Sequence, residues 1–143
     1  MSRRGQPLSA LASWCIVSGA LLAFLAVGLG AFGAHGLEGR VTPERLAAYR
    51  TGVLYHFLHA LGLLLCGAIA QFGPASGSLR WCARLLVAGV FLFSGSLYAL
   101  TAGAPSWFGM ITPLGGLSFM LAWLLLARHA RIAGQESAEP GSR

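Results

Sequence analysis

Apolar residues run in long stretches along this chain, and the charged residues are confined to the segments between them. Residues 85–127 contain no Asp, Glu, Lys, Arg or His, and residues 5–37 and 51–79 contain no Asp, Glu, Lys or Arg. Because a helix needs about 20 apolar residues to cross a bilayer, residues 85–127 are long enough for two spans. Gly103 and Pro105 supply the break between them.

This pattern predicts an all-α fold, an integral membrane four-helix bundle. Helices are expected because the lipid interior cannot satisfy exposed backbone N–H and C=O groups. The first apolar stretch is longer than the apolar region of a signal peptide, about 7–15 residues, so we expect it to be retained as a span. The predicted spans are Ala10–Phe32, Val53–Phe72, Leu85–Gly103 and Met110–Ala127.

The segment before the second predicted span carries a helix-start signal of its own. Thr42-Pro43-Glu44 combines a hydroxyl N-cap, a proline at the first helical position and a carboxylate in the first turn. We therefore expect a helix that begins at Pro43 and continues into the second span.

The composition agrees with a membrane protein and disfavours a soluble one. The chain is 56% hydrophobic and 10% charged, whereas a soluble domain carries about 25% charged residues. Its net charge of +6 comes from arginines that flank the spans, so the expected anionic partner is the lipid headgroup layer and not nucleic acid. At 143 residues the chain leaves no room for a separate catalytic module.

The distribution of arginines predicts the orientation. If both termini are cytoplasmic, the inner segments hold Arg3, Arg4, Arg80, Arg84, Arg128, Arg131 and Arg143, and the outer segments hold Arg40, Arg45 and Arg50. The positive-inside rule favours this arrangement in a bacterial inner membrane. It divides the chain into a cytoplasmic segment 1–9, the membrane domain 10–127 and a cytoplasmic tail 128–143, which we expect to be disordered.

The cysteines and glycines favour structural roles. Cys15, Cys66 and Cys82 form no CxxC motif and no paired spacing, so neither a disulfide framework nor a metal site is expected. Twenty glycines, many within the spans, indicate close helix contacts. Those contacts fit packing within one bundle, and the alternative is an interface with a second copy or another membrane protein.

Polar side chains within the spans are the candidate functional residues. In the predicted topology they gather in the outer half of the membrane, where burying a polar group is unfavourable unless it has a partner. They are interpreted as a polar pocket for a small ligand, a lipid headgroup or a partner helix. The predicted pocket residues are His35, His59, Ser94, Ser96, Tyr98 and Thr112.

Other interpretations of these residues stay open. The histidines can be wetted at the interface, and Ser or Thr in a span often bonds back to its own helix carbonyls. His56 and His59 share a helix face, so a metal- or haem-linked redox accessory is a weaker alternative. A transporter or channel subunit for a small solute or ion is another, although the inner halves of the spans are almost wholly apolar.

Enzymatic activity has little support in the sequence. No carboxylate lies within a predicted span, and the chain contains no phosphate-binding loop and no HExxH motif. We therefore expect neither a catalytic residue nor a cofactor, and favour a binding or accessory role.

Four short segments carry a resemblance to a known family: residues 30–37 (GAFGAHGL), 51–56 (TGVLYH) followed by 59–61 (HAL), 93–98 (FSGSLY) and 111–116 (ITPLGG). In this order they resemble the YgdD-type family of small bacterial inner-membrane proteins, a domain of unknown function. The resemblance implies four spans and an inner-membrane location, and it brings no established activity. It includes the six pocket residues and Pro113, whereas the family position at His56 is polar without being reliably histidine.

Overall fold

Four helical spans make up the computed structural model, which describes residues 7–73 and 75–138. Within these ranges every regular element is a helix, and the four spans are long and apolar enough to cross a membrane. The all-α prediction is therefore confirmed. The elements are α1 (Ala10–His35), α2 (Pro43–Phe72), α3 (Gly77–Gly89), the π-helix η1 (Val90–Ser94), α4 (Gly95–Thr101), the 3₁₀-helix η2 (Ser106–Met110) and α5 (Thr112–Ala138).

Three helices begin at a hydroxyl side chain that caps the backbone. The Ser9 hydroxyl accepts from the Ala12 N–H at 3.1 Å, and the Ser76 hydroxyl accepts from the Leu79 N–H at 3.1 Å. Thr42 accepts from the Arg45 N–H at 3.4 Å, so the predicted start of α2 is confirmed. Each cap satisfies one backbone donor that has no partner within the helix.

Two predicted boundaries are wrong because hydropathy marks the apolar part of a helix and not its ends. The third span begins at Gly77 and not at Leu85, since Ser76 caps it while Arg80 remains exposed. The expected disorder of residues 128–143 is wrong for 128–138, which continue α5. This segment is rich in Ala and Arg, which favour helix, and residues 139–143 lie outside the described ranges.

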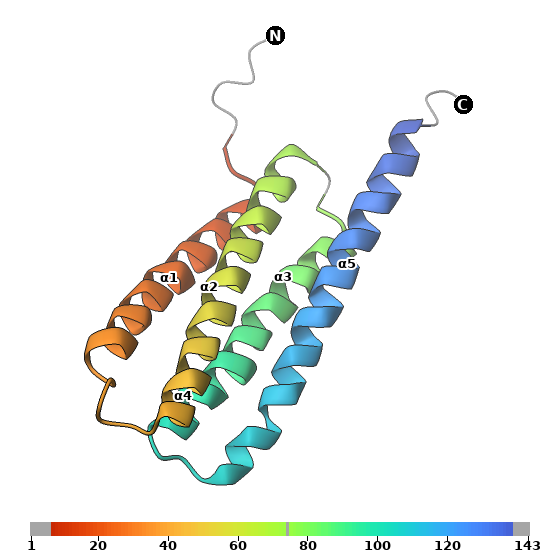
Figure 1. Ribbon diagram of the computed structural model, residues 1–143. Helices are drawn as coiled ribbons and strands as arrows, with labels where there is room; N and C mark the ends of the chain where they lie inside the picture. Colours follow the sequence, from red (N-terminus) through yellow and green to blue (C-terminus); the bar gives the residue numbers. More distant parts are fainter. Residues whose placement is uncertain (1–6, 74, 139–143) are drawn as a thin grey trace.

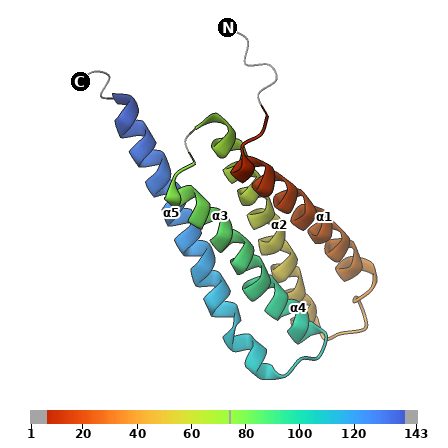
Figure 2. The ribbon, with the colours of Figure 1, turned by 180° about the vertical axis from the view of Figure 1, so that it is seen from behind.

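The helices are arranged as two pairs in one bundle. α1 packs mainly on α2, and α3 packs mainly on α5 (Figure 1). Both views place α2 between α1 and α3 (Figures 1 and 2). The start of α1 and the end of α5 lie at the same end of the bundle, called the terminal end below. The α1–α2 connection and the α4–α5 connection lie at the opposite end, called the loop end.

Glycines allow the spans to approach closely. A Cβ atom on Gly67 of α2 would lie 3.2 Å from the Ala12 carbonyl oxygen of α1. A Cβ atom on Gly115 of α5 would overlap the backbone of Phe93 in η1. These contacts support packing of small residues within a single chain, as in other membrane bundles.

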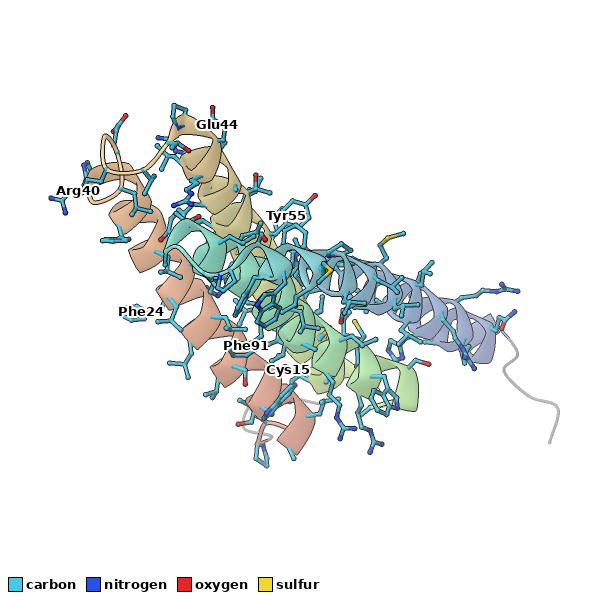
Figure 3. All side chains as sticks on the ribbon, turned by 90° about the horizontal axis from the view of Figure 1, so that it is seen from below. Cys15, Phe24, Arg40, Glu44, Tyr55 and Phe91 are labelled. Carbon is cyan, nitrogen blue, oxygen red and sulfur yellow. The ribbon has the colours of Figure 1, made fainter. Side chains whose placement is uncertain are left out.

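Part of the interior and the outer surface of the bundle are both apolar. Toward the terminal end, the core contains Leu63, Leu79 and Leu86, together with three buried thiols. The Sγ atoms of two of these thiols, Cys66 and Cys82, lie 3.6 Å apart. The outer surface is apolar as well, with Phe24 75% exposed and pointing away from α1 (Figure 3). Such a surface fits contact with lipid chains.

Candidate functional site

Two groups of side chains in the spans contain the predicted residues Ser94, Tyr98 and His59. The polar core consists of Tyr49, His56, Ser94 and Tyr98, and the aromatic cluster consists of Tyr55, His59, Phe93, Phe119 and Trp123. Ser94 is assigned to the polar core because a Cβ atom on Gly52, one turn before His56, would lie 3.5 Å from the Ser94 carbonyl oxygen and 3.0 Å from the Tyr98 ring. Both groups involve α2 and η1. The polar core adjoins α1, whereas the aromatic cluster joins α2 to α5.

The polar core is buried and contains hydrogen bonds between side chains. His56 is 4% exposed, and its Nδ1 atom lies 3.2 Å from the Tyr98 hydroxyl oxygen. The Tyr49 and Tyr98 rings lie 5.1 Å apart, and the Tyr49 hydroxyl donates to the Leu29 carbonyl oxygen of α1 at 2.8 Å. The phenol groups therefore fix one side of the His56 ring and anchor the polar core to α1.

Two buried polar atoms of the polar core lack a hydrogen bond within the described part of the chain: His56 Nε2 and Ser94 Oγ. Ser94 is 0% exposed. The Leu22 carbonyl lies on the α1 side of the His56 ring without meeting hydrogen-bond geometry. An unsatisfied buried polar group costs about 1–3 kcal/mol, so each of these two atoms calls for an additional hydrogen-bonding partner.

The π-helix η1 contains two consecutive residues that belong to different groups: Phe93 to the aromatic cluster and Ser94 to the polar core. Its Val90 carbonyl accepts from the Gly95 N–H, five residues further on, which widens the turn. Phe93 then packs against Tyr55, with ring centroids 4.6 Å apart, while Ser94 is turned into the interior. Single π turns inside α-helices occur frequently at functional sites.

His59, at the centre of the aromatic cluster, uses both of its ring nitrogens. Its Nδ1 atom lies 2.7 Å from the Tyr55 carbonyl oxygen, and Trp123 Nε1–H donates to its Nε2 atom at 3.2 Å. Since a carbonyl can only accept and an indole N–H can only donate, the ring is neutral with its proton on Nδ1. The ring also stacks on Phe119, with centroids 3.4 Å apart.

This geometry leaves His59 without a free lone pair for a metal. The Trp123 N–H occupies the Nε2 lone pair, and the Nδ1 proton occupies the other position. Among the described residues no group of three or more His, Cys, Asp or Glu side chains is placed to hold a metal ion. His59 therefore connects α2 to α5 through its hydrogen bond with Trp123.

Ser96 and Thr112 form a third, smaller contact near the loop end. The Ser96 hydroxyl donates to the Phe93 carbonyl oxygen at 2.8 Å and lies 2.7 Å from the Thr112 hydroxyl. Because a hydroxyl has one hydrogen, Thr112 is the donor between the two side chains. The pair links α4 to the first turn of α5. The bond from Ser96 to the Phe93 carbonyl oxygen is a bond within the same span, which is one of the alternatives given in the sequence analysis for serine and threonine.

Comparison with known proteins places these residues in a family. The family described as "Protein of unknown function (DUF423)" matches residues 29–116, which include the whole polar core. The chain belongs to this DUF423 family. It is 49% identical over 111 residues to the UPF0382 membrane protein YwdK of Bacillus subtilis, covering 78% of this chain and 90% of that protein. It is 44% identical over 111 residues to a UPF0382 membrane protein of Staphylococcus haemolyticus, covering 78% of this chain and 89% of that protein.

No solved structure matches the chain. The relatives are named as bacterial membrane proteins of an uncharacterised family, in agreement with the predicted membrane protein of unknown function. This DUF423 protein is thus a multi-pass membrane protein, and its molecular role has to be argued from the site.

The six predicted pocket residues make different contacts in the structure. Ser94 and Tyr98 belong to the polar core, His59 to the aromatic cluster, and Ser96 and Thr112 bond to each other. Whether any of them binds a ligand stays a prediction. The sixth residue is His35.

The expectation that His35 faces the interior is wrong. It is exposed at the end of α1. The buried stripe of this helix includes Ala26 and Gly33. His35 follows Gly33 by two residues, or about 200° around the helix, so it points away from α2.

Several polar residues with defined partners were missing from the predicted pocket. The sequence indicates only that His56 shares a helix face with His59. In the structure the His56 ring contacts Tyr98, whereas the His59 ring contacts α5. The spacing of three residues separates them by about 60°, enough to face different neighbours of a central helix. Trp123 carried no polar signal in the sequence because its single N–H is part of a large apolar ring.

Proposed function

We propose that this DUF423 protein is a membrane-embedded binding protein that holds a small hydrogen-bonding ligand in the polar core. The proposal is supported by two buried atoms, His56 Nε2 and Ser94 Oγ, that lack a hydrogen-bond partner among the described residues. Ser94 ends a π turn, a helix irregularity that is frequent at functional sites, and His56 contacts Tyr98 in the helical turn that follows.

The chemistry of the polar core favours a small neutral ligand. Ser94 can donate and accept a hydrogen bond, and His56 Nε2 can do either, depending on its tautomer. The four residues of the polar core contain no carboxylate, guanidinium or ammonium group. The ligand can therefore offer a donor, an acceptor or both, and we expect it to carry no net charge.

The packing of the bundle supports binding over passage through a single chain. Between the polar core and the terminal end lie Leu63, Leu79 and Leu86, each at most 1% exposed. These three side chains form an apolar layer between the polar core and the terminal end. We extend the proposal to a non-enzymatic accessory protein of the bacterial inner membrane with both termini cytoplasmic, as the arginine distribution favours.

The test is to identify what co-purifies with the polar core. Wild type and the His56→Phe/Ser94→Ala double variant are extracted from membranes in mild detergent, and bound polar small molecules are measured by mass spectrometry. Thr51→Ala is the matched control, because its hydroxyl is exposed and bonds to Ala47 of its own helix.

We expect a neutral polar compound in wild type and in Thr51→Ala that is absent from the double variant. Identical small-molecule profiles in all three proteins would contradict the proposal. Retention of nothing but water in wild type would contradict it as well, because it would reduce the polar core to a hydrated packing defect.

A further inference from the structure

A pocket lies at the terminal end of the bundle, on the side of α1 and α3. It has a volume of about 320 Å³ and is lined by Leu11 and Trp14 of α1 and by Arg80 and Arg84 of α3. The pocket therefore combines one apolar and aromatic wall with one basic wall. It is separate from the polar core, which lies toward the loop end.

The basic wall holds its charges in a fixed arrangement. Arg80 and Arg84 are one turn apart on α3, so they share a face. The Arg84 guanidinium lies 5.2 Å from the centre of the Trp81 ring, and Arg80 Nη2 donates to the Ala75 carbonyl oxygen at 3.0 Å. These contacts orient both side chains while leaving donors of each guanidinium unused.

No carboxylate neutralises these arginines among the described side chains. The two glutamates whose side chains are described, Glu38 and Glu44, belong to the loop end, on the other side of the membrane domain. Figure 3 shows Glu44 there together with Arg40. Two neighbouring positive charges without a counter-ion among the described side chains favour an anionic ligand.

The position of the pocket indicates that this anion comes from the membrane. Leu11 and Trp14 lie in the first two turns of α1, and Trp residues are typical of the membrane–water interface. Further along the same face of α1, Leu21 is 59% exposed, and along α3 and η1 Phe91 is 67% exposed. An apolar surface therefore continues from the pocket toward the middle of the membrane, where the chains of a bound lipid would lie.

We propose that this pocket binds the phosphodiester headgroup of an anionic phospholipid from the leaflet at the terminal end. Arg80 and Arg84 bind the phosphate oxygens through charge-assisted hydrogen bonds, and Trp14 and Leu11 pack against the glycerol and the first methylene groups. In the orientation favoured by the arginines this is the cytoplasmic leaflet, whose surface attracts basic segments through its anionic lipids.

The experiment measures which lipid stays bound. The full chain is placed in nanodiscs of equimolar phosphatidylglycerol and phosphatidylcholine, and retained lipids are counted by native mass spectrometry. The Arg80→Gln/Arg84→Gln variant is compared with Arg128→Gln/Arg131→Gln, which removes the same charge at the same end from exposed positions outside the pocket. A further arm adds excess inorganic phosphate to the nanodiscs that contain phosphatidylglycerol.

We expect wild type and the Arg128→Gln/Arg131→Gln control to retain phosphatidylglycerol in preference to phosphatidylcholine. At about 1 kcal/mol for each basic residue, the Arg80→Gln/Arg84→Gln variant should lose roughly 30-fold of this preference. Equal retention of both lipids by wild type, or an equal loss in the control variant, would overturn the proposal. Displacement of the lipid by inorganic phosphate would also overturn it, because the pocket would then be a general anion site.

The lipid proposal stands independently of the ligand in the polar core. Arg80 and Arg84 are not part of the polar core, so their substitution should leave the small polar compound in place. Loss of the lipid and loss of that compound are thus separate outcomes.

Discussion

Replacing Ser94 by alanine tests whether the polar core is occupied, because the sign of the stability change differs between an occupied and an empty site. Ser94 is fully buried and its hydroxyl has no partner among the described residues. Removing an unsatisfied buried hydroxyl should stabilise the protein by about 1–3 kcal/mol. Removing a hydroxyl that bonds to a ligand should destabilise it by about 1 kcal/mol.

We expect Ser94→Ala to be destabilising, by about 1 kcal/mol or roughly 2–4 °C in Tm. The measurement is thermal unfolding of protein extracted directly from membranes in mild detergent. Ser118→Ala is the matched control, since the Ser118 hydroxyl is also buried and donates to the Leu85 carbonyl oxygen at 2.8 Å. That control should lose a similar amount in any case.

Occupancy of the polar core by a ligand is refuted if Ser94→Ala unfolds at a higher temperature than wild type while Ser118→Ala unfolds at a lower one. Such a result would mean that the Ser94 hydroxyl is unpaired in the protein as purified. The binding proposal would then lose its main support, and the π turn would have to be explained by packing alone.

Three further predictions address packing, metal and topology. Gly115→Ala should destabilise the protein by about 3 kcal/mol, the upper end for overpacked sites, because its Cβ would overlap the Phe93 backbone. Gly28→Ala, whose Cβ meets open space, should be nearly neutral in the same thermal unfolding assay. Protein purified without added metal should carry well under one equivalent of zinc, copper or iron by elemental analysis, since both ring nitrogens of His59 are hydrogen-bonded. Stoichiometric metal that disappears in His59→Ala would show that this assignment is wrong. A reporter fused after Arg143 should be cytoplasmic and one inserted near Gly39 external, and the opposite pattern would reverse the orientation.

The parts of the fold that follow from local chemistry could be predicted from the sequence. The lipid interior requires about 20 apolar residues for each span, so four spans follow from the gaps between charged residues. The start of α2 follows from Thr42-Pro43-Glu44, because a cap depends only on residues within one turn. The extent of α5 could not be predicted in this way, since its last turns are polar and are joined to the bundle through the contact between His129 Nδ1 and the Ser76 hydroxyl, 2.7 Å apart.

The composition of the site depended on helix rotation, which the sequence does not specify. His56 and His59 were expected to share a face, but α2 has neighbours on both sides and the two rings point to different ones. His35 lies at the loop end, as its position in the chain indicates, but its side chain falls outside the buried stripe of α1. The contact between Cys66 and Cys82 likewise arises from the packing of α2 on α3 and has no signal in their spacing.

Density for the polar core, from electron cryo-microscopy at a resolution that shows ordered water, tests the central claim most directly. We predict a feature larger than a water molecule within hydrogen-bond distance of both His56 Nε2 and Ser94 Oγ. We also predict that this feature is missing in the His56→Phe/Ser94→Ala variant. A single water in wild type, or no density between these two atoms, would contradict the proposed binding function.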